Sequence, residues 1–185
     1  MDIPTKIRII GGKWRGRKLS VIKSPGLRPT PDRVRETLFN WVNKKITNAR
    51  CLDLFSGTGA LSFEALSRGA SEVTMVESNP NVVKNLTKTA DILESKLHNI
   101  NCVDVISWLK EQTKSYDIIF LDPPFGYGYV EKCCQIIYEQ SLLDNSGIIY
   151  IESEKDIDIP SVFKVKKITY TKQVQSVLVE LNKEN

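Results

Sequence analysis

The chain has 185 residues, of which 41% are hydrophobic and 26% charged, and its formal net charge is +4. This length and composition are typical of one soluble globular domain with a sizeable core. Because the chain has no run near the roughly 20 apolar residues that span a bilayer, and its first residues lack the apolar stretch of a signal peptide, we expect no membrane segment and a cytoplasmic location.

The four cysteines argue against a metal site. Cys51, Cys102, Cys133 and Cys134 show no C-x-x-C spacing, and His98 is the sole histidine that could assist them. Each cysteine lies in a segment with the pattern of a strand or a helix. We therefore expect four buried, reduced thiols and no bound metal.

Positive charge is concentrated at the N-terminus. Residues 1–50 carry 13 lysines and arginines against 3 acidic residues, a charge of +10, whereas residues 51–185 carry 13 against 19, a charge of −6. A basic end on an acidic body indicates a polyanionic partner held by that end.

A basic β-hairpin is predicted within this N-terminal segment. Residues 7–10 and 18–22 have the pattern of short strands, and the glycine-rich residues 11–17 join them. The backbone of such a turn can approach phosphates closely, while Trp14 could either stack on a base or pack beneath the hairpin. The candidate contacts to nucleic acid in the hairpin are Arg8, Lys13, Trp14, Arg15, Arg17 and Lys18.

A helix is predicted to follow. Thr30 suits its N-cap, Pro31 its first position, and Asp32 the positive end of its dipole. Apolar residues then recur at helical spacing, which places Trp41 in the core. The segment also adds Arg28, Thr30 and Arg33 to the candidate RNA contacts; Arg35 lies nearby, and the same arginines could equally be solvated surface residues.

From Arg50 onward the pattern alternates between strand and helix. Strands are predicted near 50–55, 72–77, 99–103, 116–121 and 147–152, and helices near 59–68, 80–95, 104–114 and 127–141. This alternation indicates a parallel sheet covered by helices on both faces. Residues 162–170 and 174–181 have no helix between them, so they are predicted to pair antiparallel at the sheet edge.

The first of these strands ends in the segment Asp53–Gly59, which contains Gly57 and Gly59. Glycines at this point let the backbone turn tightly and approach a ligand at the carboxyl end of the sheet. Position 62 is serine, so the segment does not fit G-x-G-x-x-G, which disfavours a dinucleotide site.

Three carboxylates follow three predicted strands. Asp53 can face an ammonium, Glu77 can accept from both hydroxyls of a ribose, and Asp104 can accept from an adenine amine, although Asp104 could instead simply cap the next helix. These are the recognition handles of S-adenosylmethionine. The D-x-F-x-G-x-G pattern of Asp53–Gly59, which includes Phe55, resembles the first motif of class I S-adenosylmethionine-dependent methyltransferases.

The segment Asp122-Pro123-Pro124-Phe125 follows another buried strand. It resembles the [DN]-P-P-[FY] motif of methyltransferases that act on planar amino nitrogens, which are poor nucleophiles. Asp122 and the Pro123 carbonyl can each accept one N–H of such an amine, the prolines fix the backbone, and Phe125 can stack on the base. Transfer would then be an in-line displacement that needs no metal.

The chain resembles the RsmD family in several longer segments and in the Asp122–Phe125 motif. The longer segments include Arg8–Arg17, Asp32–Trp41 and Glu64–Ala70. The resemblance implies a bacterial methyltransferase that uses S-adenosylmethionine to modify N2 of guanine 966 of 16S rRNA. It also implies a substrate of partly assembled 30S subunits rather than bare RNA.

The expected fold is α/β: a Rossmann-like class I methyltransferase sheet of seven strands in the order 3-2-1-4-5-7-6, with an N-terminal β-hairpin extension. The expected domains are a basic arm at 1–30 and a methyltransferase domain at 31–185, in a monomer. The family often has a glycine-containing stretch in its last strands, where this chain has residues 172–176. We expect that difference to affect a hairpin turn and not the chemistry.

Two other functions use parts of the same pattern. A methyltransferase acting on adenine N6 in DNA, or on another rRNA, has a similar amine clamp, but DNA enzymes usually carry a separate segment for target recognition, for which this chain has little room. A non-enzymatic RNA chaperone would need the basic hairpin and no clamp. The motif itself accepts either guanine or adenine.

Overall fold

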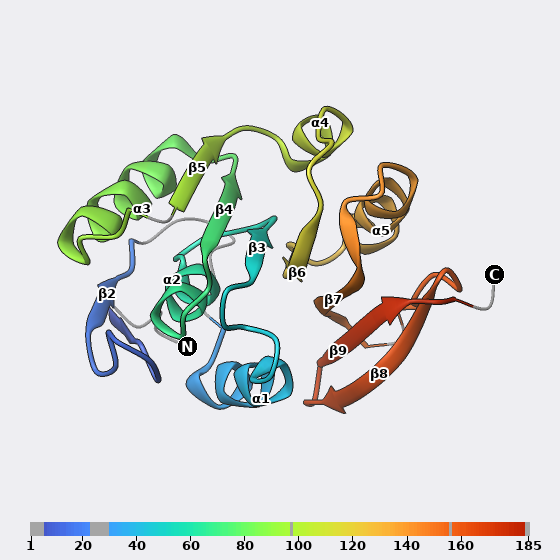
Figure 1. Ribbon diagram of the computed structural model, residues 1–185, viewed down its shortest axis with the longest axis horizontal. Coiled ribbons are helices and arrows are strands. Elements are labelled where there is room, and N and C mark those ends of the chain that lie inside the picture. Colours follow the sequence, from blue (N-terminus) through green and yellow to red (C-terminus); the bar gives the residue numbers. More distant parts are fainter. Residues whose placement is uncertain (1–5, 23–29, 97, 156, 184–185) are drawn as a thin grey trace.

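The computed structural model describes residues 6–22, 30–96, 98–155 and 157–183. A seven-stranded sheet runs through its centre (Figure 1). The strands are β3 (Arg50–Asp53), β4 (Glu72–Glu77), β5 (His98–Cys102), β6 (Tyr116–Leu121), β7 (Leu143–Glu154), β8 (Phe163–Tyr170) and β9 (Val174–Leu181).

The strands lie in the order β5-β4-β3-β6-β7-β9-β8. Counted from β3 as the first strand, this is the predicted order 3-2-1-4-5-7-6. The pairs from β5 to β7 are parallel, and β9 pairs antiparallel with both β7 and β8. The strands β4 and β5 are added on one side of β3, and the chain then returns to place β6 on the other side. This switch in the order of the strands is where such sheets bind ligands.

Helices cover both faces of the sheet, as predicted. They are α1 (Asp32–Val42), α2 (Ala60–Ser67), α3 (Pro80–Ile92), α4 (Val105–Lys110) and α5 (Tyr129–Glu139). One buried cluster packs α1, α2 and α3 against one face, and a second packs α4 and α5 against the other. Consecutive residues of β3, Cys51 and Leu52, belong to different clusters, because a strand points alternate side chains to opposite faces.

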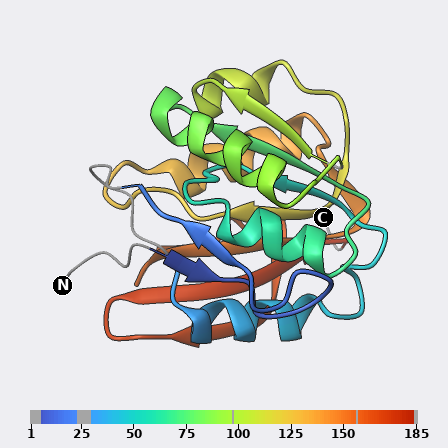
Figure 2. The same ribbon diagram turned by 90° about the vertical axis from the view of Figure 1, so that its left-hand side faces the viewer.

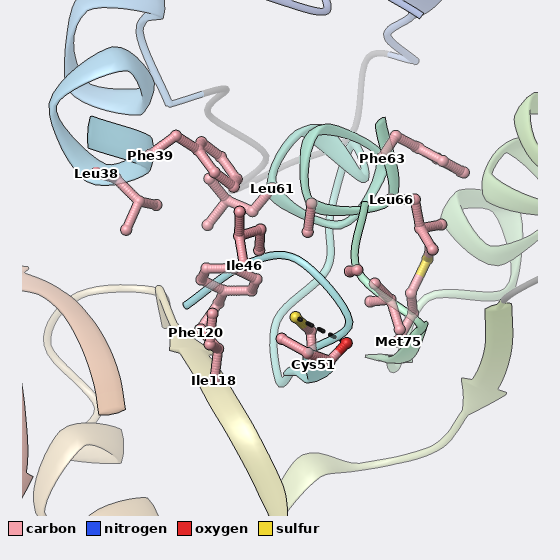
Figure 3. Packing of buried hydrophobic residues seen from close by; sticks show 14 of the residues in the cluster. Leu38, Phe39, Ile46, Cys51, Leu61, Phe63, Leu66, Met75, Ile118 and Phe120 are labelled. Atoms are coloured by element: carbon pink, nitrogen blue, oxygen red, sulfur yellow. Dashed lines mark hydrogen bonds between the residues drawn. The ribbon is translucent and has the colours of Figure 1, made fainter. Parts of the chain in front are cut away.

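Figure 3 shows the first cluster from nearby. The Phe39 ring of α1 meets the Phe120 ring of β6 with 6.0 Å between centroids. Leu61 and Leu66 of α2 are also buried there. Phe39 and Phe120 are fully buried, and burying a side chain of this size contributes about 2 kcal/mol to stability.

The N-terminal hairpin consists of β1 (Lys6–Arg8) and β2 (Lys18–Ser20), which pair antiparallel. It packs beside α2 and α3 (Figure 2), and its Ile9 and Leu19 join the first buried cluster. The turn of the hairpin lies directly on α2, since a Cβ added at Gly12 would fall 1.8 Å from the Ser67 carbonyl oxygen. We call residues 6–22 the arm.

Three local predictions are wrong. Thr30 does not cap α1: the N-cap residue is Pro31, and no side chain caps it. The helix predicted near 104–114 is only the short α4. Cys102 is exposed, whereas Cys51, Cys133 and Cys134 are buried as expected. No helix in the described part of the chain is both long and apolar enough to span a membrane.

Candidate active site

A cleft of about 730 Å³ opens at the carboxyl ends of β3, β4, β6 and β7. It brings together the glycine turn after β3, the acidic ends of the neighbouring strands, and the proline motif after β6. The residues predicted at the cofactor end (Asp53, Phe55, Gly57, Glu77, Asp104) and at the reacting end (Asp122, Pro123, Pro124, Phe125) all line it; Gly59 lies in the turn itself.

The glycine turn is shaped by the sequence Gly57-Thr58-Gly59. Gly59 is the N-cap of α2 and has a φ of 74°, in the left-handed region. A Cβ at this position would lie 2.5 Å from the Phe63 ring and 2.7 Å from Leu86, so both the backbone and the space require glycine. The amide of Gly57 donates to Oε2 of Glu77 at 3.1 Å, which ties the turn to the end of β4.

Asp53 is buried at the end of β3, and Ser62 Oγ donates to its Oδ2 at 2.5 Å. Ser62, which stands where the G-x-G-x-x-G pattern would have its last glycine, thus fixes the Asp53 carboxylate by a hydrogen bond. Burial raises the pKa of Asp53 to about 7, although the Ser62 hydrogen bond favours the charged form and the Glu77 carboxylate opposes it. A nearby cation would stabilise the ionised form of Asp53.

Glu77 and Asp104 occupy the ends of the next two strands. The Asn79 amide donates to Oε1 of Glu77 at 2.8 Å, so backbone amides orient both of its oxygens. Asp104 is the N-cap of α4 and its Oδ1 accepts from the amide and hydroxyl of Ser107. The capping role of Asp104 is therefore confirmed, and a role in adenine binding stays a prediction.

At the other end of the cleft, Thr30 Oγ1 donates to Oδ2 of Asp122 at 3.0 Å. Burial raises the pKa of Asp122 well above its usual range, the Glu152 carboxylate raises it further, and the Thr30 hydrogen bond opposes both effects. Glu152 lies on the neighbouring strand β7, and Tyr150 Oη donates to its Oε2 at 3.0 Å. The cleft thus has a second carboxylate beside Asp122.

Aromatic rings border the cleft between its two ends. The rings of Phe55 and Tyr129 meet edge to face, with 5.1 Å between centroids, and Tyr127 lies 6.1 Å from Tyr129. Phe125 and Tyr127 have relative exposures of 38% and 65%, so their faces are accessible to a flat ligand.

The β8–β9 turn also contributes to the cleft. Thr171, Val174 and Ser176 line it. Part of the segment 172–176, which we expected to affect a hairpin turn and not the chemistry, therefore lies at the cleft, and its effect on the chemistry stays untested. The reason is that β9 pairs with β7, which places Ser176 opposite Glu152.

The predicted RNA contacts fall into two groups. Six basic side chains are exposed, five on the arm and one at the start of α1: Arg8, Lys13, Arg15, Arg17, Lys18 and Arg33. Trp14 is buried in the first cluster with Lys13 Nζ 4.3 Å from its ring centroid, which corrects its assignment as a base-stacking residue. Thr30 is buried and contacts Asp122, while Arg28 lies outside the described residues.

Two residues of the site region were missed from the sequence. Glu152 directly follows the apolar run 148–151, the same signal that identified Asp53 and Asp122. Arg35 is fully buried instead of facing solvent, and it contacts the arm and Thr30 through backbone carbonyls. Its burial depends on the packing of α1 against α2, which helical spacing alone does not reveal.

The family model described as conserved hypothetical protein 95 matches residues 7–182. The chain belongs to this family, the RsmD family. It is 45% identical over 157 residues to Ribosomal RNA small subunit methyltransferase D of Escherichia coli (strain K12), covering 85% of this chain and 79% of that protein. The protein of the same name from Buchnera aphidicola subsp. Acyrthosiphon pisum is 40% identical, covering 94% and 93%.

The RsmD family assignment agrees with the fold. The solved structure of an Escherichia coli protein proposed to be a methyltransferase, yhhF, superposes with a TM-score of 0.89 at 40% identity, covering 96% of this chain and 98% of that one. The architecture is that of the Rossmann-like class I methyltransferases, as predicted.

Proposed function

We propose that this protein transfers a methyl group from S-adenosylmethionine to the exocyclic N2 of guanine 966 of 16S rRNA in the assembling 30S subunit. The observation that carries the proposal is the cleft itself. It joins the Asp122–Pro123 amine clamp to a site with acidic strand ends suited to this cofactor, within one continuous space. The names of the Escherichia coli and Buchnera relatives support small-subunit rRNA as the substrate.

The residues at the cofactor end fit S-adenosylmethionine. Asp53 is a buried carboxylate suited to its ammonium, and Glu77, held by two backbone amides, is suited to accept from its ribose hydroxyls. Asp104 also lines the cleft and is the proposed acceptor for the adenine amine. The apolar Phe55 also lines the cleft. When bound, the cofactor supplies an electrophilic methyl group.

At the reacting end, Asp122 and the Pro123 carbonyl act as two acceptors for the N–H groups of the target amine. These hydrogen bonds favour a tetrahedral nitrogen whose lone pair is no longer delocalised into the base. Thr30 fixes one oxygen of Asp122 and so aims the carboxylate. Phe125 provides an exposed ring on which a flipped base can stack. Most of the acceleration then comes from orientation and preorganised charge.

The arm is the proposed RNA contact, aided by Arg33 and by Arg28. Its exposed basic side chains would neutralise phosphates, and its backbone turn is held rigidly on α2. We further propose that the enzyme works as a cytoplasmic monomer in which an N-terminal segment, residues 1–30 with the arm at its centre, and the methyltransferase domain, residues 31–185, bind the subunit together.

The decisive experiment measures transfer of a labelled methyl group to 30S subunits from cells that lack this protein, followed by mapping of the modified nucleotide. We expect one label, on N2 of guanine 966. Duplex DNA serves as the competing substrate. Labelling of DNA adenine instead of the subunits would refute the proposal and support the alternative amine substrate, and labelling at another rRNA position would correct the site.

A further inference from the structure

A second basic surface lies on the β8–β9 hairpin, far from the arm in sequence. Residues 163–183, which we call the C-terminal hairpin, carry five lysines against one acidic residue, whereas residues 51–162 carry 8 lysines and arginines against 17 acidic residues. The lysines are Lys164, Lys166, Lys167, Lys172 and Lys183, and all five are exposed. The C-terminal hairpin is therefore a positive region on an otherwise acidic body.

The acidic residue of this hairpin neutralises only part of that charge. Lys166 Nζ lies 2.9 Å from Oε1 of Glu180. This hydrogen bond lowers the pKa of Glu180, and the charges of Lys164 and Lys183 lower it further. One carboxylate is thus shared by three lysines, so a positive excess remains on the hairpin even before the other two lysines are counted.

The helix α1 connects this surface to the arm. At the last turn of α1, the centroid of the Trp41 ring lies 5.9 Å from Nζ of Lys167 on β8. At its first turn, Asp32 pairs with Arg8 of the arm at 3.7 Å, and the carbonyl of Arg8 accepts a hydrogen bond from Arg35. The arm and the C-terminal hairpin therefore lie against opposite ends of the same helix, which Figure 1 shows between them.

The reacting end of the cleft adjoins both basic surfaces. Thr30 directly precedes the N-cap of α1, and it lines the cleft and donates to Asp122. Thr171 directly follows β8 and lines the same cleft, and Lys172 is the next residue in the β8–β9 turn. A nucleotide whose base is bound at Asp122 therefore has its flanking phosphates near the start of α1 and near this turn.

The lysines on β8 also have a simpler interpretation. β8 is the outermost strand of the sheet, and lysines on an edge strand hinder its pairing with another chain. This role requires charge on the strand itself. Lys172 lies in the turn and Lys183 lies beyond the end of β9, so edge protection accounts for only three of the five lysines.

Resting on the proposed function, we propose that the C-terminal hairpin is a second RNA-binding surface, on which Lys167 and Lys172 contact phosphates of nucleotides that flank the target guanine. Phosphates are the groups that a cluster of exposed lysines attracts, and each contact releases condensed counterions. Such contacts carry no sequence information, so this surface adds affinity and fixes the orientation of the RNA, while the amine clamp binds the target base. The arm and the C-terminal hairpin together hold the RNA at two sites beside the cleft.

The test measures how the affinity for RNA depends on salt in the variant Lys167→Gln with Lys172→Gln, which loses two charges but keeps both side chains long. The binding partners are 30S subunits from cells that lack this protein and protein-free 16S rRNA. Each lost phosphate contact reduces the slope of log K against log salt by about 0.7–0.9, so we expect a slope shallower by about 1.6 on both partners. Between about 50 and 200 mM salt, the wild-type enzyme should then lose roughly 10-fold more affinity than the variant.

Lys110→Gln with Lys114→Gln is the matched control. Both residues are exposed and lie at or just after the end of α4, outside the cleft lining. Lys114 Nζ lies 5.7 Å from the centroid of the Tyr116 ring, so this variant also loses a cation beside an aromatic ring, as Lys167→Gln does. The control should keep the wild-type slope.

A wild-type slope in the variant that lacks Lys167 and Lys172 would overturn the proposal. A slope that is reduced on 30S subunits but not on protein-free rRNA would overturn it as well, because the partner of the hairpin would then be a ribosomal protein. Failure of the proposed function is a separate result, since the wild-type enzyme would then transfer no labelled methyl group to the subunits, whatever the slopes.

Discussion

The buried carboxylate of Glu64 holds the arm on the body, and its removal should be strongly destabilising. Glu64 has no exposed surface. Its two oxygens accept from the amides of Ile10 and Gly11, each at 2.7 Å, and from Arg68 Nε, also at 2.7 Å. The guanidinium of Arg35, likewise fully buried, lies 3.5 Å from it. In Glu64→Ala the amides of Ile10 and Gly11 and Arg68 Nε lose their acceptor, and Arg35 loses one of its two carboxylate neighbours.

The magnitude follows from these contacts. Removing one partner of a buried ion pair typically costs about 3–5 kcal/mol, because the other charge stays buried without compensation. Arg35 keeps its ion pair with Asp32 at 2.6 Å, so we expect the lower end of this range, a loss of about 3 kcal/mol in the free energy of unfolding. This is still a large share of the roughly 5–15 kcal/mol of a typical domain. Urea denaturation would measure it, and hydrogen exchange of the Ile10 and Gly11 amides would show whether the arm has come loose.

A double-mutant cycle tests the reasoning itself. Arg35→Met removes the buried cation, so Glu64→Ala combined with Arg35→Met should be destabilised by less than the sum of the two single variants. Glu131→Ala, an exposed position on α5, is the surface control and should change stability by no more than about 0.5 kcal/mol. Glu64→Ala with stability and amide protection close to the wild type would refute the argument.

Three further predictions concern the clamp, the arm and the cofactor end. Asp122→Ala should lower kcat by roughly 10- to 150-fold, the factor that corresponds to the free energy of one hydrogen bond to a charged group, and should retain cofactor affinity. A wild-type kcat would show that Asp122 does not bind the target amine. Changing Arg15 and Arg17 to Gln should weaken subunit binding and flatten its dependence on salt, and an unaltered salt slope would exclude the arm as the RNA contact. Burial raises the pKa of Asp53 to about 7 in the folded protein, above its value in the unfolded chain. The free energy of unfolding should therefore fall as the pH rises from about 4 to 7. Asp53→Asn should therefore stabilise the cofactor-free protein more at pH 8 than at pH 4 in urea denaturation, and an equal effect at both would contradict the pKa.

Much of the site could be predicted because it depends on local rules. Asp53, Glu77 and Asp122 each end an apolar strand, and the carboxyl ends of parallel strands meet at one edge of a sheet. A reader who knows only the strand pattern can therefore place these residues in a common cleft. The glycine turn is equally local, since its conformation is required by the sharp passage from β3 to α2.

The residues that were misassigned depend instead on contacts distant in sequence. Thr30 resembles an N-cap, yet its hydroxyl bonds Asp122, 92 residues away. Trp14 and Arg35 look like surface residues of a basic segment, but both are buried where the arm and α1 meet α2. Burial of this kind is a property of the assembled layers, and single-sequence patterns report only the element on which a residue lies.

The same contacts join the arm to the clamp. Arg35 donates to the carbonyls of Arg8 and Thr30 and faces Glu64, while Thr30 holds Asp122 through its side chain. Loosening the Glu64 anchor should therefore disturb the aim of the Asp122 carboxylate and lower kcat as well as stability. Neutralising Arg15 and Arg17 removes exposed charge and one exposed hydrogen bond from Arg17 to the Ile92 carbonyl of α3, both far from the Asp122 contacts, so it should affect subunit affinity and leave kcat nearly unchanged. Steady-state kinetics on 30S subunits separates the two effects: an unchanged kcat in a folded Glu64→Ala enzyme would show that the arm and the clamp act independently.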